Sequence, residues 1–360
     1  MQSRHTLTSS ERSRLLPFVV ASGDISPRDQ RDLMERPFFS LSKTKRTTPI
    51  LYATGDVRVE VFGMPEHGMA TIWDADVLIW TASQIVDAEN LGLTTSRFLR
   101  FTPYQLLTGI GRQTGARDYG LLRAALARLQ STVVATTIRN GQNWRRHQFS
   151  WITEWEICAS RKGRAAGVEI VIPEWLYRGV TDRSLVLAID PAYFRLTGGI
   201  ERWLYRVARK HAGRQSAGWV FEIAHLHRKS GSLARAADFA FDIRRIATRQ
   251  PLPGYCLRVE HDGGRELLRI RPTGDLSTHP VDKTVSPIGT SGVRSIGTSG
   301  VPLSGLQACK PQLSLWPETA IPALNLSNLE SNSFVDGKRR SADNASQPSI
   351  APSRGPGDGP

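Results

Sequence analysis

Hydrophobic and polar positions follow two different periods along the first 272 residues of the chain. Strand-like alternation occurs first, at Ile50–Ala53 and Val57–Val61, on either side of a short turn. Helical spacing then predicts a helix with a broad apolar face at Thr71–Ala88 and another at Asp118–Leu129. A proline in the first turn, where no amide donor is needed, predicts a short helix over Pro103–Gly109.

A β-hairpin is predicted directly after these helices. The β-branched run Thr132–Ile138 is followed by the tight-turn signal Asn140-Gly141, and Trp144–Ile152 returns. Helix, short helix, helix and hairpin is the order of a winged-helix domain. Basic residues near the hairpin tip could reach a phosphate or the minor groove, and a solvated tip explains them equally well: Arg139, Arg145 and Arg146.

The same order of elements is predicted a second time, after two strand candidates between Val168 and Ile189. Its helices are expected at Ile200–His211, Phe221–Arg228 and Ser232–Thr248, and its hairpin at Tyr255–Val259 and Glu266–Ile270 with a turn through Asp262-Gly263-Gly264. The sequence therefore predicts an α+β fold with two tandem winged-helix domains that carry β-hairpin wings. We expect a flexible arm over residues 1–35, the first domain with its linking strands over 36–190, and the second over 191–272.

The remainder, residues 273–360, has a different composition. It is rich in Ser, Gly and Pro and contains a near-duplication, in which Ile288–Ser295 resembles Ile296–Pro302. Such a segment buries too little apolar area to offset the entropy lost on ordering, so we expect a disordered tail. Basic and acidic residues are balanced there, so the formal net charge of +14 belongs to the first 272 residues. A basic folded body suits a polyanionic partner.

The remaining composition favours a cytoplasmic protein in contact with the nucleoid. Three cysteines, Cys158, Cys256 and Cys309, form no CxxC pair and no even framework, which fits a reducing compartment and argues against structural zinc. The N-terminal residues contain no signal-peptide core. No apolar run approaches the roughly 20 residues that span a bilayer, so no membrane contact is expected.

The helix predicted from residue 232 gives the strongest functional signal. One face has Arg235, Asp238, Asp242, Arg245 and Arg249, and the opposite side has Leu233, Ala236, Ala240, Ile243 and Ala247. A helix in the major groove needs one face packed on its domain and another that presents arginines to bases and phosphates. An ordinary solvated amphipathic helix is the alternative. Residues expected to bind DNA here are Arg228, Lys229, Ser232 as the helix cap, Arg235, Arg244, Arg245 and Arg249.

A short apolar cluster in the tail predicts a second binding site. Gln312-Leu313-Ser314-Leu315-Trp316 resembles the five-residue peptide that binds bacterial replication sliding clamps. A glutamine amide can bond the rim of a pocket while Leu313, Leu315 and Trp316 fill an apolar cleft, and a disordered segment can take up that shape on binding. Pro317 stands where the pattern sometimes has another apolar residue.

No catalytic, cofactor or metal site is predicted, and we expect a binding protein rather than an enzyme. The sequence has no GxxxxGK[ST] phosphate loop. His225-Leu226-His227 resembles the His-hydrophobic-His pair with which nicking initiators hold a metal. That pair needs a strand to bring both imidazoles to one face, whereas this segment reads as helix. The next tyrosine, Tyr255, opens a predicted strand.

The run Thr197–His211 resembles the replication initiator protein A family of proteobacterial plasmids. The resemblance continues in Trp219–Ile223, Val168–Arg178 and Arg36–Ser42 and covers about residues 30–272. It implies tandem winged-helix domains that bind directly repeated sites in double-stranded DNA at a plasmid origin and melt adjacent DNA. It also implies recruitment of host helicase, host initiator and polymerase components. Related initiators contain a clamp peptide resembling Gln312–Trp316, and a homodimer is compatible with this class.

Two other functions remain open from the sequence. A transcriptional repressor with the same two domains would recognise a groove in the same way. A metal-dependent nicking initiator would instead use His225 and His227.

Overall fold

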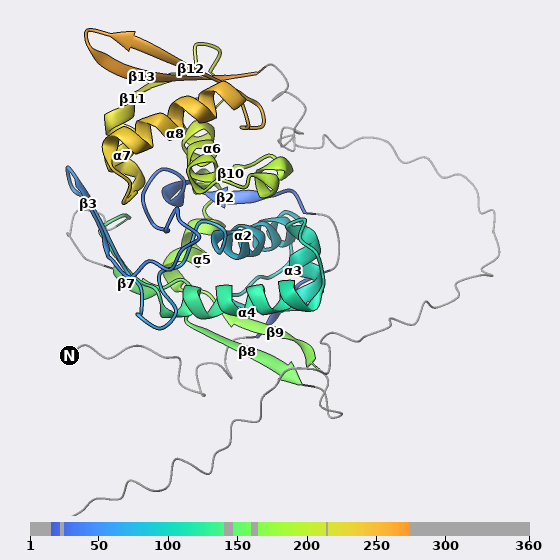
Figure 1. Ribbon diagram of the computed structural model, residues 1–360. Coiled ribbons are helices and arrows are strands. Elements are labelled where there is room, and N and C mark those ends of the chain that lie inside the picture. The colour runs from blue at the N-terminus through green and yellow to red at the C-terminus, as the bar shows by residue number, and fades with distance from the viewer. Residues whose placement is uncertain (1–15, 22–24, 140–146, 160–164, 214, 274–360) are drawn as a thin grey trace, which may run out of the picture. The chain divides into compact units, whose positions relative to one another are not determined.

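The computed structural model describes residues 16–21, 25–139, 147–159, 165–213 and 215–273 (Figure 1). The predicted tail therefore lies outside the described residues from Gly274 onward. The same holds for the tip of the first predicted hairpin.

Three helices in the first half lie where the sequence pattern predicts them: α2 (Ala75–Asn90), α3 (Pro103–Gly109) and α4 (Ala116–Ser131). At the start of α3, Thr102 accepts a hydrogen bond from the Gln105 amide, and the Gln105 side chain accepts one from the Thr102 amide. Helix α2 begins at Ala75 rather than at the predicted Thr71. Asp74 accepts hydrogen bonds from the Thr71 amide and hydroxyl, at 2.8 and 3.0 Å, and these bonds hold a turn before the helix.

The strands of this half form two four-stranded sheets, ordered β3-β4-β6-β7 and β1-β5-β9-β8. Their bounds are β1 (Phe18–Val19), β3 (Ile50–Thr54), β4 (Val57–Phe62), β5 (Phe98–Phe101), β6 (Val133–Thr136), β7 (His147–Ser150), β8 (Glu154–Ala159) and β9 (Ala165–Val171). The predicted first hairpin exists as the antiparallel pair β6 and β7. It does not stand alone, because β6 also pairs with β4 and extends the sheet that β3 begins.

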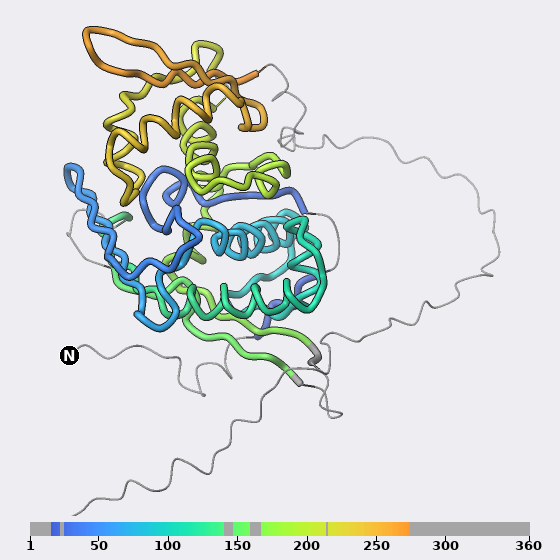
Figure 2. Tube along the Cα trace, viewed as in Figure 1, coloured from blue at the N-terminus to red at the C-terminus, as the bar shows by residue number. Residues whose placement is uncertain are grey.

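The second half has the helices α6 (Gly199–His211), α7 (Ile223–Ser230) and α8 (Ala236–Arg249), and the strands β11 (Trp219–Glu222), β12 (Tyr255–Asp262) and β13 (Arg265–Pro272). Phe221, expected at the start of a helix, lies in β11 and pairs with Leu268. The predicted second hairpin is confirmed. Its two-residue turn, Gly263-Gly264, has φ values of 54° and 78°, which glycine adopts without strain. This hairpin is drawn in orange in Figure 2.

The two halves repeat one order of elements. Helix, strand, helix, helix and hairpin occur as α6-β11-α7-α8-β12-β13 in the second half. The first half has the same order, α2-β5-α3-α4-β8-β9, with β6 and β7 inserted between α4 and β8. In both, the single strand pairs with the last strand of the hairpin, giving β5-β9-β8 and β11-β13-β12. In the first repeat, the hairpin that corresponds to β12 and β13 in strand order is therefore β8 and β9, rather than the predicted pair β6 and β7.

Between the repeats the chain forms α5 (Glu174–Thr181), β10 (Val186–Ala188) and the 3-10 helices η2 (Arg183–Leu185) and η3 (Pro191–Arg195). The two strand candidates expected between Val168 and Ile189 correspond to β9 and β10. Strand β10 pairs with β2 (Arg28–Gln30), which is followed by the 3-10 helix η1 (Arg31–Leu33).

The expected flexible arm over residues 1–35 is wrong for residues 28–35. Leu33 and Met34 belong to the core, at 2% and 0% exposure. Asp29 accepts a hydrogen bond from the buried Arg206 guanidinium at 2.6 Å. Asp29 thus neutralises a cation of α6, and the local sequence pattern does not reveal this pairing.

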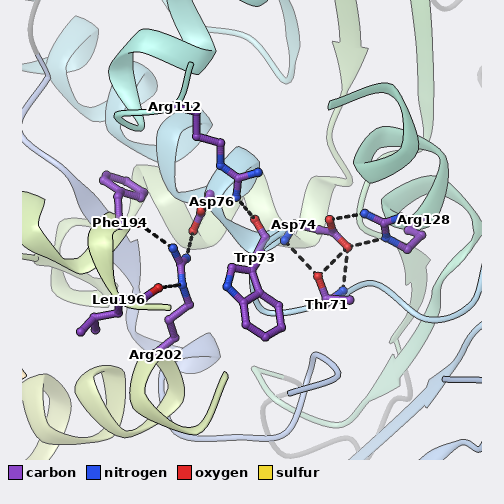
Figure 3. A network of polar contacts seen from close by, with 9 residues as sticks. All are labelled: Thr71, Trp73, Asp74, Asp76, Arg112, Arg128, Phe194, Leu196 and Arg202. Carbon is purple, nitrogen blue, oxygen red and sulfur yellow. Dashed lines mark hydrogen bonds and ion pairs between the residues drawn. The ribbon is translucent and has the colours of Figure 1, made fainter. Parts of the chain in front are cut away.

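A network of ion pairs holds α2 to its neighbours (Figure 3). The buried Asp76 carboxylate lies between Arg112 and Arg202, at 2.9 and 2.6 Å. Burial raises the pKa of Asp76, while the charges of the two guanidinium groups oppose that rise. Arg202 also donates to the carbonyl oxygens of Phe194 and Leu196. This network ties α6, of the second repeat, to α2, of the first.

A second ion pair in Figure 3 joins α4 to the start of α2. Arg128 donates to both carboxylate oxygens of Asp74, at 2.7 and 2.8 Å. The Arg128 side chain is 25% exposed. In the described part of the chain, no helix has the length and apolar character needed to cross a bilayer.

Candidate nucleic-acid interface

Helices α7 and α8 are joined by a turn that is fixed by backbone geometry and hydroxyl groups. Gly231 ends α7 in the left-handed conformation, with φ of 64°. A Cβ atom at this position would lie 2.7 Å from the Pro37 Cβ, so the position requires glycine for two reasons. The Ser230 hydroxyl donates to the His227 carbonyl at 2.8 Å and accepts from the Ser232 amide at 3.1 Å.

Ser232 does not cap α8, contrary to the expectation. The helix begins at Ala236, and its N-cap is Arg235, which makes no capping hydrogen bond. The Ser232 hydroxyl instead accepts from the Ala234 amide at 3.2 Å, and His227 Nε2 bonds the Ala234 carbonyl at 2.8 Å. These local bonds continue the turn as far as Ala234, before α8 starts at Ala236.

One face of α8 is buried, but not through all the predicted residues. Phe239, Ile243, Ile246 and Ala247 are buried. Ile243 and Ala247 belong to the predicted set, whereas Leu233 is 64% exposed. The buried face of α8 therefore includes the larger side chains Phe239 and Ile246, and it is rotated from the face that the predicted alanines define.

The four predicted arginines of this segment are exposed. Their side-chain exposures are 85% for Arg235, 47% for Arg244, 59% for Arg245 and 50% for Arg249. Each lies within 2.8 Å of a carboxylate; in the same order, the partners are Asp238, Glu266, Asp242 and Glu201. Exposed ion pairs such as those of Arg235 and Arg245 are weak and are screened by salt, so a phosphate can replace the carboxylate. Glu201 is only 6% exposed, so Arg249 also neutralises a buried carboxylate. Contact of these arginines with DNA stays a prediction.

The adjoining cations of α7 differ from each other. Arg228 is exposed, as expected. Lys229 is buried, and its ammonium nitrogen lies 2.7 Å from the Glu35 carboxylate. Lys210 and His211 of α6 each lie 2.6 Å from the same carboxylate. Lys229 therefore holds α7 against the rest of the protein instead of facing a ligand.

Of the cations expected at the tip of the first hairpin, Arg139 lies within the described residues. Arg139 turns inward, stacks 3.8 Å from the centre of the Trp175 ring and lies 2.9 Å from Asp32. Burial lowers the pKa of Arg139, and the charges of Asp32 and Asp182 oppose this effect. The prediction that Arg139 faces DNA from a solvated tip was wrong, because a ring and a carboxylate far along the chain enclose it. Arg145 and Arg146 lie outside the described residues, as do Gln312, Leu313, Leu315 and Trp316.

The last hairpin adds cations that the sequence analysis did not single out. Arg258 of β12 and Arg271 of β13 are exposed on the strand positions that alternate with the buried Leu257 and Ile270. Opposite Arg258 in the strand register is Arg269, which pairs with Glu260 at 2.8 Å. The alternation Arg269-Ile270-Arg271 was a visible signal for this face.

His225 and His227 lie on α7, as the helical pattern predicts. His227 packs 5.1 Å from the Phe239 ring centre. Burial and the nearby charges of Lys229 and Arg228 lower the pKa of His225. Tyr255, which a nicking mechanism would require as a nucleophile, is 3% exposed at the start of β12.

Comparison with known proteins defines the class of the molecule. A sequence model described as replication initiator protein A matches residues 28–257. A protein of Wigglesworthia glossinidia brevipalpis described as "Putative replication protein" is 32% identical over 231 residues, which cover 62% of this chain and 82% of that protein. The class is that of replication initiators. The chain belongs to the replication initiator protein A family, as the resemblance in its sequence predicted.

Two crystal structures of domains 2 and 3 of RctB are similar to the chain at lower sequence identity. One, of selenomethionine derivatives, has a TM-score of 0.48 and 13% identity and covers 66% of this chain and 96% of that one. The other has a TM-score of 0.46 and 12% identity and covers 66% and 95%. At these scores the likeness carries no conclusion about the site.

Proposed function

We propose that this chain binds directly repeated sites at a plasmid origin, promotes opening of the adjacent duplex and recruits host replication proteins. The observation that carries the proposal is the exposed arginine face of α8 beside a rigid turn and a cationic hairpin. A helix fixed to its domain by one face can enter the major groove with the other, and arginine suits both guanine edges and phosphates.

We interpret each repeat of helix, strand, helix, helix and hairpin as a winged-helix domain. In the second repeat, α8 is the recognition helix and the hairpin of β12 and β13 is the wing. In the first repeat, α4 and the hairpin of β8 and β9 hold the corresponding positions. Two such domains on one chain suit an extended site, and a homodimer would suit several repeats. On this interpretation the chain acts by binding, without a catalytic centre.

The arginine face is tested by the double variant Arg245→Ala and Arg249→Ala. Binding to the origin duplex should weaken. Loss of an arginine that contacts a base should cost about 1–3 kcal/mol of binding free energy and relax specificity at that base. Loss of an arginine that contacts a phosphate should weaken binding to all DNA sequences alike. Fluorescence anisotropy at physiological salt measures both cases. The matched control is Arg178→Ala on α5, an exposed arginine in a similar ion pair with Glu174. Unchanged origin affinity of the double variant would refute the assignment.

Recruitment of a sliding clamp is tested separately, with a peptide that contains Gln312–Trp316. The peptide should bind purified clamp, and Leu313→Ala should abolish binding because the apolar pocket loses its occupant. Calorimetry with a Ser314→Ala peptide as control measures this, and an inert wild-type peptide would end the clamp hypothesis.

Initiation is distinguished from repression by duplex opening. An initiator should make an A·T-rich origin segment reactive to a single-strand-specific reagent, whereas a repressor would bind without this effect. Metal-dependent nicking of the same DNA would instead support the nicking alternative.

A further inference from the structure

A large apolar side chain stands at the centre of the exposed face of α8. Phe241 is 60% exposed, although phenylalanine is among the residues most often buried. With about 100° of rotation per residue, it lies roughly opposite the buried stripe formed by Phe239, Ile243 and Ile246. Ala237, one turn earlier, is exposed beside it. The two form a small apolar strip in the N-terminal half of the helix.

The polar groups around this strip already have partners within the protein. Arg245 pairs with Asp242, and Arg235 pairs with Asp238. Within the described part of the chain, Phe241 is not among the residues that pack against the core. Water therefore covers its ring in the free protein, and an apolar occupant would release that water at a gain in free energy.

The surrounding charge indicates what kind of occupant fits. Arg244, Arg245 and Arg249 flank the strip, and Arg228 is exposed on the preceding helix. A polyanion that offers a small apolar group at the right depth satisfies both features. Duplex DNA does so in its major groove, where the only apolar group on the base edges is the 5-methyl group of thymine, and phenylalanine and alanine side chains contact it.

We propose that Phe241, with Ala237 beside it, recognises thymine methyl groups in the major groove. The preferred site then contains thymine where it meets the middle of α8, and Phe241 determines specificity at that point while the arginines bind phosphates and other bases. This inference rests on the proposed binding of origin DNA and adds to it the chemical group that is read.

The test replaces thymine by deoxyuridine in the origin repeat, which removes the methyl group and leaves the base-pair hydrogen bonds intact. The full chain should bind the uridine duplex more weakly, by about fourfold for each methyl group contacted, a loss equivalent to one buried methylene. Phe241→Ala should weaken binding to the thymine duplex and have little further effect on the uridine duplex. The control is Leu91→Ala, a 77% exposed apolar residue at the end of α2.

The outcomes separate this inference from the proposed function. If the wild-type chain binds no origin duplex, the proposed function fails. If it binds thymine and uridine duplexes equally, DNA binding stands and methyl recognition is overturned. A Phe241→Ala variant that loses the same factor on both duplexes would also overturn methyl recognition, in favour of a general contact. The comparison of duplexes with the wild-type chain needs no variant, so it decides the matter even if Phe241→Ala does not fold.

Discussion

A buried carboxylate holds α7 in addition to the apolar contacts of Ile223 and Leu226. The Glu35 carboxylate contacts Lys210, His211 and Lys229, from two helices of the second repeat, and the neighbouring Arg36 at 3.2 Å. Burial alone would raise the pKa of Glu35, but hydrogen bonds from His211, Lys210 and Lys229 outweigh that effect and hold the pKa well below its usual range. The charged form of Glu35 therefore stabilises the fold. It holds α7, the helix that precedes the exposed arginine face of α8.

The variant Glu35→Gln should lower the free energy of unfolding at pH 7 by about 3 kcal/mol, because it leaves largely buried cations without their counterion. The folded-state pKa of Glu35 is lowered, so its contribution is complete above the unfolded value of about 4.3 and is lost as pH falls below it. The difference between wild type and variant should accordingly shrink in acid. Urea unfolding at several pH values measures this.

The control for this prediction is Glu174→Gln, which removes a carboxylate that is 51% exposed and pairs with Arg178. It should change stability by less than about 0.5 kcal/mol. A Glu35→Gln protein as stable as wild type at pH 7, or a difference that does not depend on pH, would contradict the role given to this carboxylate.

At the scale of elements, the turn between α7 and α8 positions the proposed recognition helix. Gly231→Ala should destabilise the protein through two separable effects. An alanine in the left-handed conformation costs about 1–2 kcal/mol, and its Cβ would also overlap Pro37. Gly92→Ala isolates the first effect, because Gly92 has φ of 74° with no atom within 4 Å of the added Cβ. Thermal unfolding should show the larger loss for Gly231→Ala, and equal losses would show that the Pro37 contact is unimportant.

Elements were predictable from sequence where the signal is local. The short helix over Pro103–Gly109 and the hairpin with Gly263-Gly264 follow from proline and glycine geometry, and both lie where predicted. The hairpin of β8 and β9 was missed because β9 was read as an isolated linking strand, without its partner β8. Helix α8 starts four residues later than expected, because serine hydroxyls stabilise a turn there rather than a cap.

The candidate site was predictable only in part, for a related reason. Exposure of Arg245 and Arg249 follows from helical periodicity alone. The burial of Lys229 does not, because its partner Glu35 is 194 positions away in the sequence. The inward turn of Arg139 likewise depends on Trp175 and Asp32, which belong to other elements. Long-range charge pairing is the information that a single sequence lacks.

At the scale of the whole molecule, two copies of one arrangement share buried ion pairs. Arg202 and Arg206 extend from α6 to Asp76 and Asp29, at 2.6 Å each. Removing one partner of such a pair leaves an unpaired buried charge, so these contacts favour a fixed position of α6 relative to α2, which contains Asp76, and to β2, which contains Asp29. Two recognition elements in a fixed relation would read an extended site, which suits the direct repeats expected of this family.

The proposed function requires that the chain bind repeated sequences at its own origin. Footprinting of the full chain on DNA from its replicon tests this most directly. We predict protection of a series of direct repeats, with the protection lost as salt rises because phosphate contacts release counterions. Uniform cleavage across the replicon at every protein concentration, with no protected repeat at low salt, would contradict the claim.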